Sequence, residues 1–177
     1  MRLVFYRVPG ELWRTRFVIE AVGDVPAERF WQAGLDASDS RCFVSSCDED
    51  IYVFDLETKT LLSSFDDEGE HSEETRPIED MLRGLDLPLA VGEEEVLFRI
   101  FGLHYGNGPT QVGSTAIRVD EAAAKVVFSG GGGEQRLPYD AFSGDWAYCS
   151  LALTGRVAAL IEPYEVRIFE RGTPFAR

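Results

Sequence analysis

Carboxylate side chains are the groups in this sequence best placed to do chemistry, because of both their number and their spacing. The chain of 177 residues contains 31 Asp and Glu against 17 Lys and Arg, which gives a formal net charge of −14. The segment 48–95, called the acidic segment below, holds 17 of these acids and only three bases, Lys59, Arg76 and Arg83. Its net charge of −14 equals that of the whole chain, so the rest of the sequence is neutral.

Such a concentration of like charge steers an oppositely charged partner into contact, and it selects that partner more than it adds affinity. It repels phosphate groups, which excludes nucleic acid and anionic membrane surfaces as partners. We therefore predict a surface that binds a basic protein, with Tyr52, Phe54 and Phe65 as aromatic anchors beside the acids. The residues assigned to this surface are Asp48, Glu49, Asp50, Tyr52, Asp66, Asp67, Glu68, Glu70, Glu73 and Glu74. The alternative is that the acidic segment only keeps the protein in solution.

Acid-rich runs can also bind divalent cations, but only when their spacing is right. A Ca²⁺ loop needs Asp or Asn at alternate positions, then Gly, then Glu six residues later. The runs 48–52 and 66–69 both break this spacing. Zinc needs closely spaced Cys and His ligands, and neither the pair at 42 and 47 nor His71 and His104 is followed by a second pair. We predict neither a metal site nor a cofactor.

Catalytic motifs are equally sparse. A nucleophilic Cys149 served by His104 has no local signature, and the sequence favours a buried strand thiol instead. The run 108–115 has the outline of a phosphate-binding P-loop but lacks its Lys. The four glycines 130–133 lack the spacing and the following helix of a dinucleotide site. The sequence therefore favours a binding protein over an enzyme; the alternative is a small-molecule-binding or hydrolytic β-domain with its site near His104 and the loop 106–113.

The elements that must position these residues are mostly strands, because apolar and polar residues alternate with a period of two over many short stretches. The run 95–105 is apolar on both faces and predicts a central, covered strand. The predicted strands are 3–8, 12–21, 41–46, 51–56, 60–65, 95–105, 115–119, 125–128, 147–153, 157–162 and 164–170. The fold class is mainly β (α+β), an antiparallel sheet or two packed sheets of about ten strands with two short helices. We expect the stretches 3–8 and 12–21 to pair with each other.

Start and stop signals place the two helices. The first, 24–34, opens with an Asp-x-Pro pattern and closes at Gly34. The second, 77–83, follows a capping Thr and closes at Gly84. The stretch 85–90 contains a proline and is predicted to be irregular.

Length and cysteine content set the protein class. A chain of this length with 45% hydrophobic residues predicts one domain, 1–177, with a sizeable core. Three cysteines, an odd number, without a signal-peptide pattern predict free thiols and a cytoplasmic location. Within the domain, 66–74 is predicted to be a mobile polar loop. The resulting hypothesis is an immunity-type inhibitor that neutralises a basic bacterial toxin, for example a nuclease; a structural module of a larger assembly is the other alternative.

Overall fold

The protein is mainly β, as the alternation predicts. The computed structural model describes residues 12–65, 78–131, 133–140 and 146–172. Within them lie fourteen strands, one short helix and three antiparallel sheets, against the prediction of about ten strands and two short helices. The predicted strand 3–8 and loop 66–74 lie outside the described residues.

The central sheet has the order β1-β14-β13-β12, and each of its two faces packs against a different hydrophobic core. Its strands are β1 (Trp13–Glu20), β12 (Tyr148–Leu151), β13 (Val157–Ile161) and β14 (Glu165–Arg171). Every residue of β13 is buried, because Val157, Ala159 and Ile161 face one core while Ala158 and Leu160 face the other. A strand that is covered on both faces has a nearly continuous apolar sequence. The Val, Ala, Leu and Ile residues of β13 form such a sequence.

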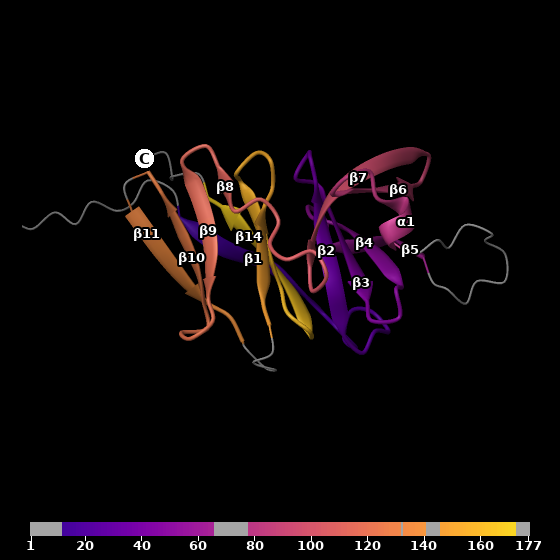
Figure 1. The fold of residues 1–177 in the computed structure, drawn as a ribbon, viewed down its shortest axis with the longest axis horizontal. Coiled ribbons are helices and arrows are strands. Elements are labelled where there is room, and N and C mark those ends of the chain that lie inside the picture. Colours follow the sequence, from indigo (N-terminus) through magenta and orange to yellow (C-terminus); the bar gives the residue numbers. More distant parts are fainter. Residues whose placement is uncertain (1–11, 66–77, 132, 141–145, 173–177) are drawn as a thin grey trace, which may run out of the picture.

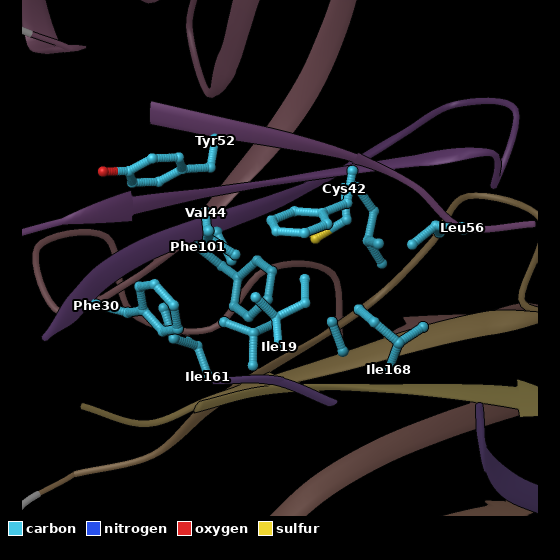
Figure 2. Packing of buried hydrophobic residues seen from close by; sticks show 14 of the residues in the cluster. Ile19, Phe30, Cys42, Val44, Tyr52, Leu56, Phe101, Ile161 and Ile168 are labelled. Carbon is cyan, nitrogen blue, oxygen red and sulfur yellow. The ribbon is translucent and has the colours of Figure 1, made fainter. Parts of the chain in front are cut away.

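The large sheet covers one face of the central sheet, in the order β5-β4-β3-β2-β7-β6. Its strands are β2 (Phe30–Asp36), β3 (Arg41–Ser46), β4 (Ile51–Asp55), β5 (Thr60–Phe65), β6 (Asp86–Val91) and β7 (Glu94–Gly102). Figure 2 shows the first core between these sheets, where Phe30 and Phe101 meet Ile161 and Ile168. The large sheet curls, so that its other face encloses a core of its own around Phe43 and Phe98, beside the helix α1 (Ile78–Met81).

The small sheet covers the opposite face of the central sheet, in the order β11-β10-β9-β8. Its strands are β8 (Gln111–Val112), β9 (Thr115–Asp120), β10 (Lys125–Gly130) and β11 (Gly133–Pro138). Trp13 stacks on Phe128 with ring centroids 4.3 Å apart, and Phe128 in turn meets Phe169 edge-on. The three sheets therefore follow one another across the molecule, small, central and large (Figure 1).

A bulge in β1 lets one strand serve both cores. Thr15 lies opposite Phe169 and Phe17 opposite Ile168, so one residue is inserted between them. The insertion reverses the alternation of faces. Trp13 consequently packs against the small sheet, whereas Ile19 packs against the large sheet.

Two expectations about local structure are wrong. The stretch 24–34 contains no helix, because Phe30–Asp36 is the strand β2, hydrogen-bonded to β3 on one side and β7 on the other. Gly34 does not end a helix: it lies in the strand where a Cβ would collide with the Phe43 ring and come within 2.9 Å of the Arg99 carbonyl oxygen. The stretch 85–90 is not irregular, because β6 tolerates its Pro88 at the outer edge of the sheet.

The first described strand, β1, pairs with β14 on one side. Its predicted pairing with 3–8 stays a prediction, because 3–8 lies outside the described residues. The covered strand predicted at 95–105 is β7, and it is covered on both faces only toward its end: Phe101 is buried in the first core, whereas Leu97 is 43% exposed. The second predicted helix is confirmed as the single turn α1. The meander formed by β3, β4 and β5 and the hairpin of β9 and β10 are confirmed.

Candidate functional site

Five acids of the acidic segment gather at one end of the large sheet. At this end the last paired residues are Phe30 with Ser46, Ile51 with Phe65, and Gln32 with Gly102. The turn between β3 and β4 therefore lies here, beside the finish of β5. We call the group formed by Asp48, Glu49, Asp50, Glu79 and Asp80 the acidic end.

A buried serine builds the turn that carries three of these acids. The Ser46 hydroxyl oxygen accepts hydrogen bonds from the backbone N–H groups of Asp48 and Asp50, both at 3.2 Å. Glu49 has a φ of 66°, in the left-handed region that non-glycine residues rarely occupy. Asp48 and Glu49 are exposed. The turn that follows Ser46 therefore carries three consecutive acids.

Tyr105 shows that acids distant in the sequence converge in space. Burial raises the pKa of the Tyr105 hydroxyl above its ordinary value, and the negative charges of Glu79 and then Glu49 raise it further. Glu79 belongs to α1 and Glu49 to the turn before β4, so two separate elements bring charge to one hydroxyl. Neither glutamate forms an ion pair within the described part of the chain. The acidic end is therefore a net negative surface at this point.

Aromatic rings stand beside the acidic end. The Trp31 and His104 rings meet edge-to-face with centroids 5.1 Å apart. The Leu103 N–H donates to the Trp31 carbonyl oxygen at 2.8 Å, which fixes the loop that carries His104 and Tyr105 against β2. Acids next to partly exposed aromatic rings suit a guanidinium or ammonium group, which gains from both charge and ring face.

Other acids of the same segment are neutralised by arginines. Asp86 pairs with Arg99 at 2.6 Å, Glu94 with Arg41 at 3.1 Å, and Glu95 with Arg83 at 2.7 Å. Arg41 and Arg99 come from outside the acidic segment, in β3 and β7. Part of the segment's charge is therefore cancelled by residues that only the fold brings near.

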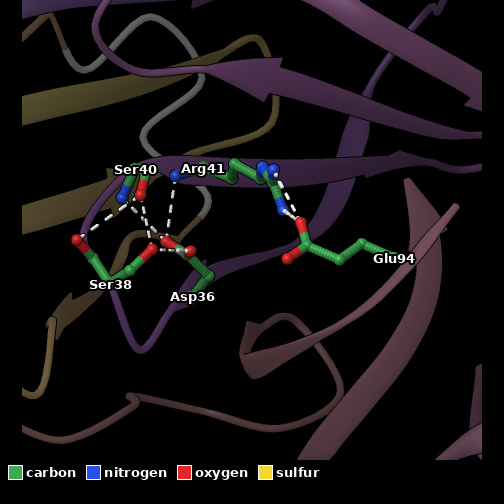
Figure 3. Close-up of polar contacts among 5 residues, drawn as sticks. All are labelled: Asp36, Ser38, Ser40, Arg41 and Glu94. Atoms are coloured by element: carbon green, nitrogen blue, oxygen red, sulfur yellow. Dashed lines mark hydrogen bonds and ion pairs between the residues drawn. The ribbon is translucent and has the colours of Figure 1, made fainter. Parts of the chain in front are cut away.

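The end of the large sheet opposite the acidic end holds Asp36, Arg41 and Glu94, which we call the arginine end. The Asp36 carboxylate is 5% exposed and accepts hydrogen bonds from the N–H groups of Ser40 and Arg41, both at 2.9 Å, and from the Ser38 hydroxyl (Figure 3). Figure 3 also shows Arg41 reaching Glu94 with both terminal guanidinium nitrogens. Asp36 thus shapes the β2–β3 turn and places the arginine that neutralises Glu94.

The residues that the sequence predicts to bind a partner fall into three groups in the structure. Asp48, Glu49 and Asp50 lie together in the acidic end. Tyr52 and Phe54 are 4% and 5% exposed and pack in the first core, so their rings offer little area to a partner in this structure. The remaining assigned acids, Asp66, Asp67, Glu68, Glu70, Glu73 and Glu74, lie outside the described residues.

The alternative small-molecule site is predicted near the loop 106–113. In the structure, residues 107–109 of this loop hydrogen-bond to the backbone of β12. Gly108 donates its N–H to the Cys149 carbonyl oxygen at 3.0 Å, and the Leu151 N–H donates to the Pro109 carbonyl oxygen at 2.6 Å. The Asn107 side chain accepts from the Cys149 N–H at 2.9 Å. A side chain at 108 would collide with Ser150, which explains the glycine. The run that resembled a P-loop thus covers the edge of β12.

Two of the three cysteines, Cys42 and Cys149, are poor nucleophiles in this setting. Cys42 and Cys149 are buried, and burial raises the pKa of each thiol to about 12. A thiol with such a pKa is almost entirely protonated at neutral pH, whereas the thiolate is the reactive form. All three cysteines, with Cys47, are free thiols.

Sequence reasoning missed a buried carboxylate cluster at the β13–β14 turn. Glu162 is 1% exposed, and within the described residues its Oε1 atom has no hydrogen-bond partner. Burial, together with the nearby charge of Glu165, raises the pKa of Glu162 to about 7, while Arg167 acts in the opposite direction. Arg167 is instead engaged by Glu165 at 2.6 Å and reaches Asp140 at 3.7 Å. Only the fold could reveal the cluster, because Glu-Pro-x-Glu reads as an ordinary exposed turn.

Among the described residues, no group of three or more His, Cys, Asp or Glu side chains is arranged to hold a metal ion. Within the same residues, no helix has the length and apolar character needed to span a bilayer. No protein-family model and no curated protein sequence matches this chain.

Proposed function

We propose that this protein binds a basic protein through the acidic end and neutralises it, as an immunity-type inhibitor does with a toxin. One observation carries the proposal: Glu49 and Glu79, from separate elements, both act on the Tyr105 hydroxyl and have no arginine paired with them in the described chain. Their charge is therefore available to a partner. The acids that form ion pairs with Arg41, Arg83 and Arg99 are not part of this surface.

The partner that fits this surface has clustered lysines or arginines. Enzymes that act on nucleic acids present such clusters to the phosphate backbone, so a nuclease toxin is the type of partner we propose. Carboxylates at the acidic end would occupy the positions that phosphates take. Steering by these charges raises the association rate, and Trp31 and Tyr105 can then stack on a guanidinium or ammonium group.

The test compares two double variants that change net charge equally. E49Q/E79Q removes the pair near Tyr105, and E57Q/E93Q removes two exposed acids of the same segment in the β4–β5 and β6–β7 turns. The tagged full chain and both variants are used to capture proteins from native bacterial lysate at low and high salt, and the captured protein is then purified. We expect a basic partner whose binding is about tenfold weaker to E49Q/E79Q, and about twofold weaker or less to E57Q/E93Q.

Binding should also weaken as salt is raised, because exposed charges are screened. Three results contradict the proposal: no partner is recovered, the partner is acidic, or the two variants weaken binding equally. The last result would mean that overall charge, rather than the acidic end, governs binding.

A further inference from the structure

The outer strands of the three sheets differ in how their free edges are protected. An unpaired edge exposes a row of N–H and C=O groups that can pair with another chain, and proteins protect it with charges, proline, short length, cover or a β-bulge. Five of the six outer strands among the described residues are protected by charge, proline, short length or cover. These are β1 with Arg14 and Arg16, β6 with Asp86 and Pro88, β8 with only two residues, β11 with Glu134 and Arg136, and β12 with the covering loop 107–109.

Among the described residues, the sixth outer strand, β5, has none of these four features and is protected only by a bulge. Its sequence TLLSSF has no charged residue and no proline, and it is six residues long. Leu61 and Leu62 are 46% and 43% exposed. Within the described chain, the backbone of β5 is hydrogen-bonded only to β4. The one irregularity is a bulge between Leu61 and Ser63, which leaves Leu62 without a partner residue on β4.

Charge decides which strand could pair with this edge. The finish of β5 lies beside the β3–β4 turn, because Phe65 pairs with Ile51, and that turn carries Asp48 and Glu49. A second copy of this chain also carries a net charge of −14, so like-charge repulsion opposes its approach. An extended segment bearing Lys or Arg would meet opposite charge instead.

We infer that β5 accepts an extended, basic segment of the partner as a seventh strand of the large sheet. In strand addition, main-chain hydrogen bonds supply affinity and alternate side chains supply specificity. Leu61 and Leu62 supply apolar contact, and the acidic end selects basic side chains. The choice of a basic segment rests on the proposed function, whereas the open edge of β5 does not.

The experiment uses the full chain and a synthetic peptide of about ten residues, long enough to cover a strand of this length. In the probe peptide, Lys alternates with Val. Two further peptides have the same sequence with N-methyl groups on alternate residues, one peptide for each of the two registers, which removes backbone donors without changing charge. A fourth peptide replaces Lys with Glu. Binding is measured by calorimetry, and the location of binding by amide hydrogen exchange.

We expect the Lys peptide to slow exchange of the β5 amides. N-methylation in the pairing register, or the substitution Leu62→Lys, should weaken its binding by about tenfold, because at least two hydrogen bonds or an apolar contact are lost. N-methylation in the other register should have little effect and serves as the matched control.

Each of the remaining outcomes contradicts a specific part of this inference. If both N-methylated peptides bind like the parent and β5 exchange is unchanged, or if no peptide binds, strand addition is wrong. If the Glu peptide protects β5 as well as the Lys peptide does, the edge binds strands but the basic partner of the proposed function is wrong. If β5 becomes protected with protein concentration alone, the occupant is a second copy and the inference fails.

Discussion

The two ends of the large sheet hold their carboxylates in opposite ways. At the arginine end, Asp36 accepts three hydrogen bonds and Glu94 pairs with Arg41. At the acidic end, Glu49 and Glu79 lie near the same tyrosine, and neither is ion-paired within the described residues. The acids Glu49, Glu79 and Glu94 all come from one acidic segment. Charge density along a chain therefore does not determine charge on its surface, because the outcome depends on which strands carry arginines.

The largest expected effect concerns Glu162, a buried carboxylate whose Oε1 atom has no hydrogen-bond partner among the described residues. Glu162 ionises with a pKa of about 7 in the folded protein, above the ordinary value of 4.5. Below pH 4.5 it is protonated in both states and costs nothing. Stability is therefore lost as pH rises through about 7, by roughly 3 kcal/mol in total.

The substitution Glu162→Gln removes this titration. Urea unfolding from pH 4 to pH 8 should show the variant gaining about 3 kcal/mol over the wild type across this range. The comparison uses the change in the free energy of unfolding between pH 4 and pH 8. Any effect of the new amide group that does not depend on pH therefore cancels. Parallel stability profiles for the two proteins would show that Glu162 does not titrate in this window.

A smaller effect should follow from breaking the arginine end. Asp36→Ala removes the acceptor for the N–H groups of Ser40 and Arg41, and it releases the turn that places Arg41. We expect a loss of about 2 kcal/mol in the free energy of unfolding, since hydrogen bonds to a charged group are lost at a buried site. Ser38→Ala, which deletes one donor to Asp36, is the control and should cost less than half as much. Equal losses would argue against Asp36 as the organising group.

The smallest effect should come from the acidic end, where Asp48, Glu49, Glu79 and Asp80 are exposed. The variant D48N/E49Q/E79Q/D80N relieves repulsion between exposed acids, so its urea midpoint should rise slightly at low salt. At about 1 M salt, where the Debye length is roughly 3 Å, the gain should vanish. Glu94→Gln, which deletes the partner of Arg41, should lower the midpoint instead. A fall in both variants would mean that the acidic end is held by attractive contacts.

Elements built from neighbouring residues could be predicted from the sequence. Alternation identified the strands β3, β4 and β5 and the hairpin of β9 and β10, because both partners of each pair are close in the chain. The error at 24–34 arose because Asp24 and Pro26 imitate a helix start. Asp24 instead accepts a hydrogen bond from the Glu20 N–H at 2.7 Å in a turn. Tertiary pairing with β3 and β7 then decides that Phe30–Asp36 is a strand.

The candidate site was predictable only as a list of acids. Composition placed Asp48, Glu49 and Asp50 in a charged segment, and the turn keeps them together. Their proximity to Glu79 and Tyr105 depends on contacts between elements about 30 to 55 positions apart, which no local pattern encodes. The arginines that cancel Asp86 and Glu94 were hidden for the same reason.

The position of β14 has a consequence for how the molecule is made. This strand lies between β1 and β13, and Arg14 and Glu170, which form an ion pair across β1 and β14, are 156 positions apart. During translation, neither of the two cores that the central sheet shares can close until residues 165–171 have left the ribosome. Such long-range pairing is slow, on the order of milliseconds to seconds in small β proteins. The nascent chain must therefore carry exposed β-strands until β14 has been synthesised, and a truncation before β14 would leave β1 and β13 without the strand that joins them.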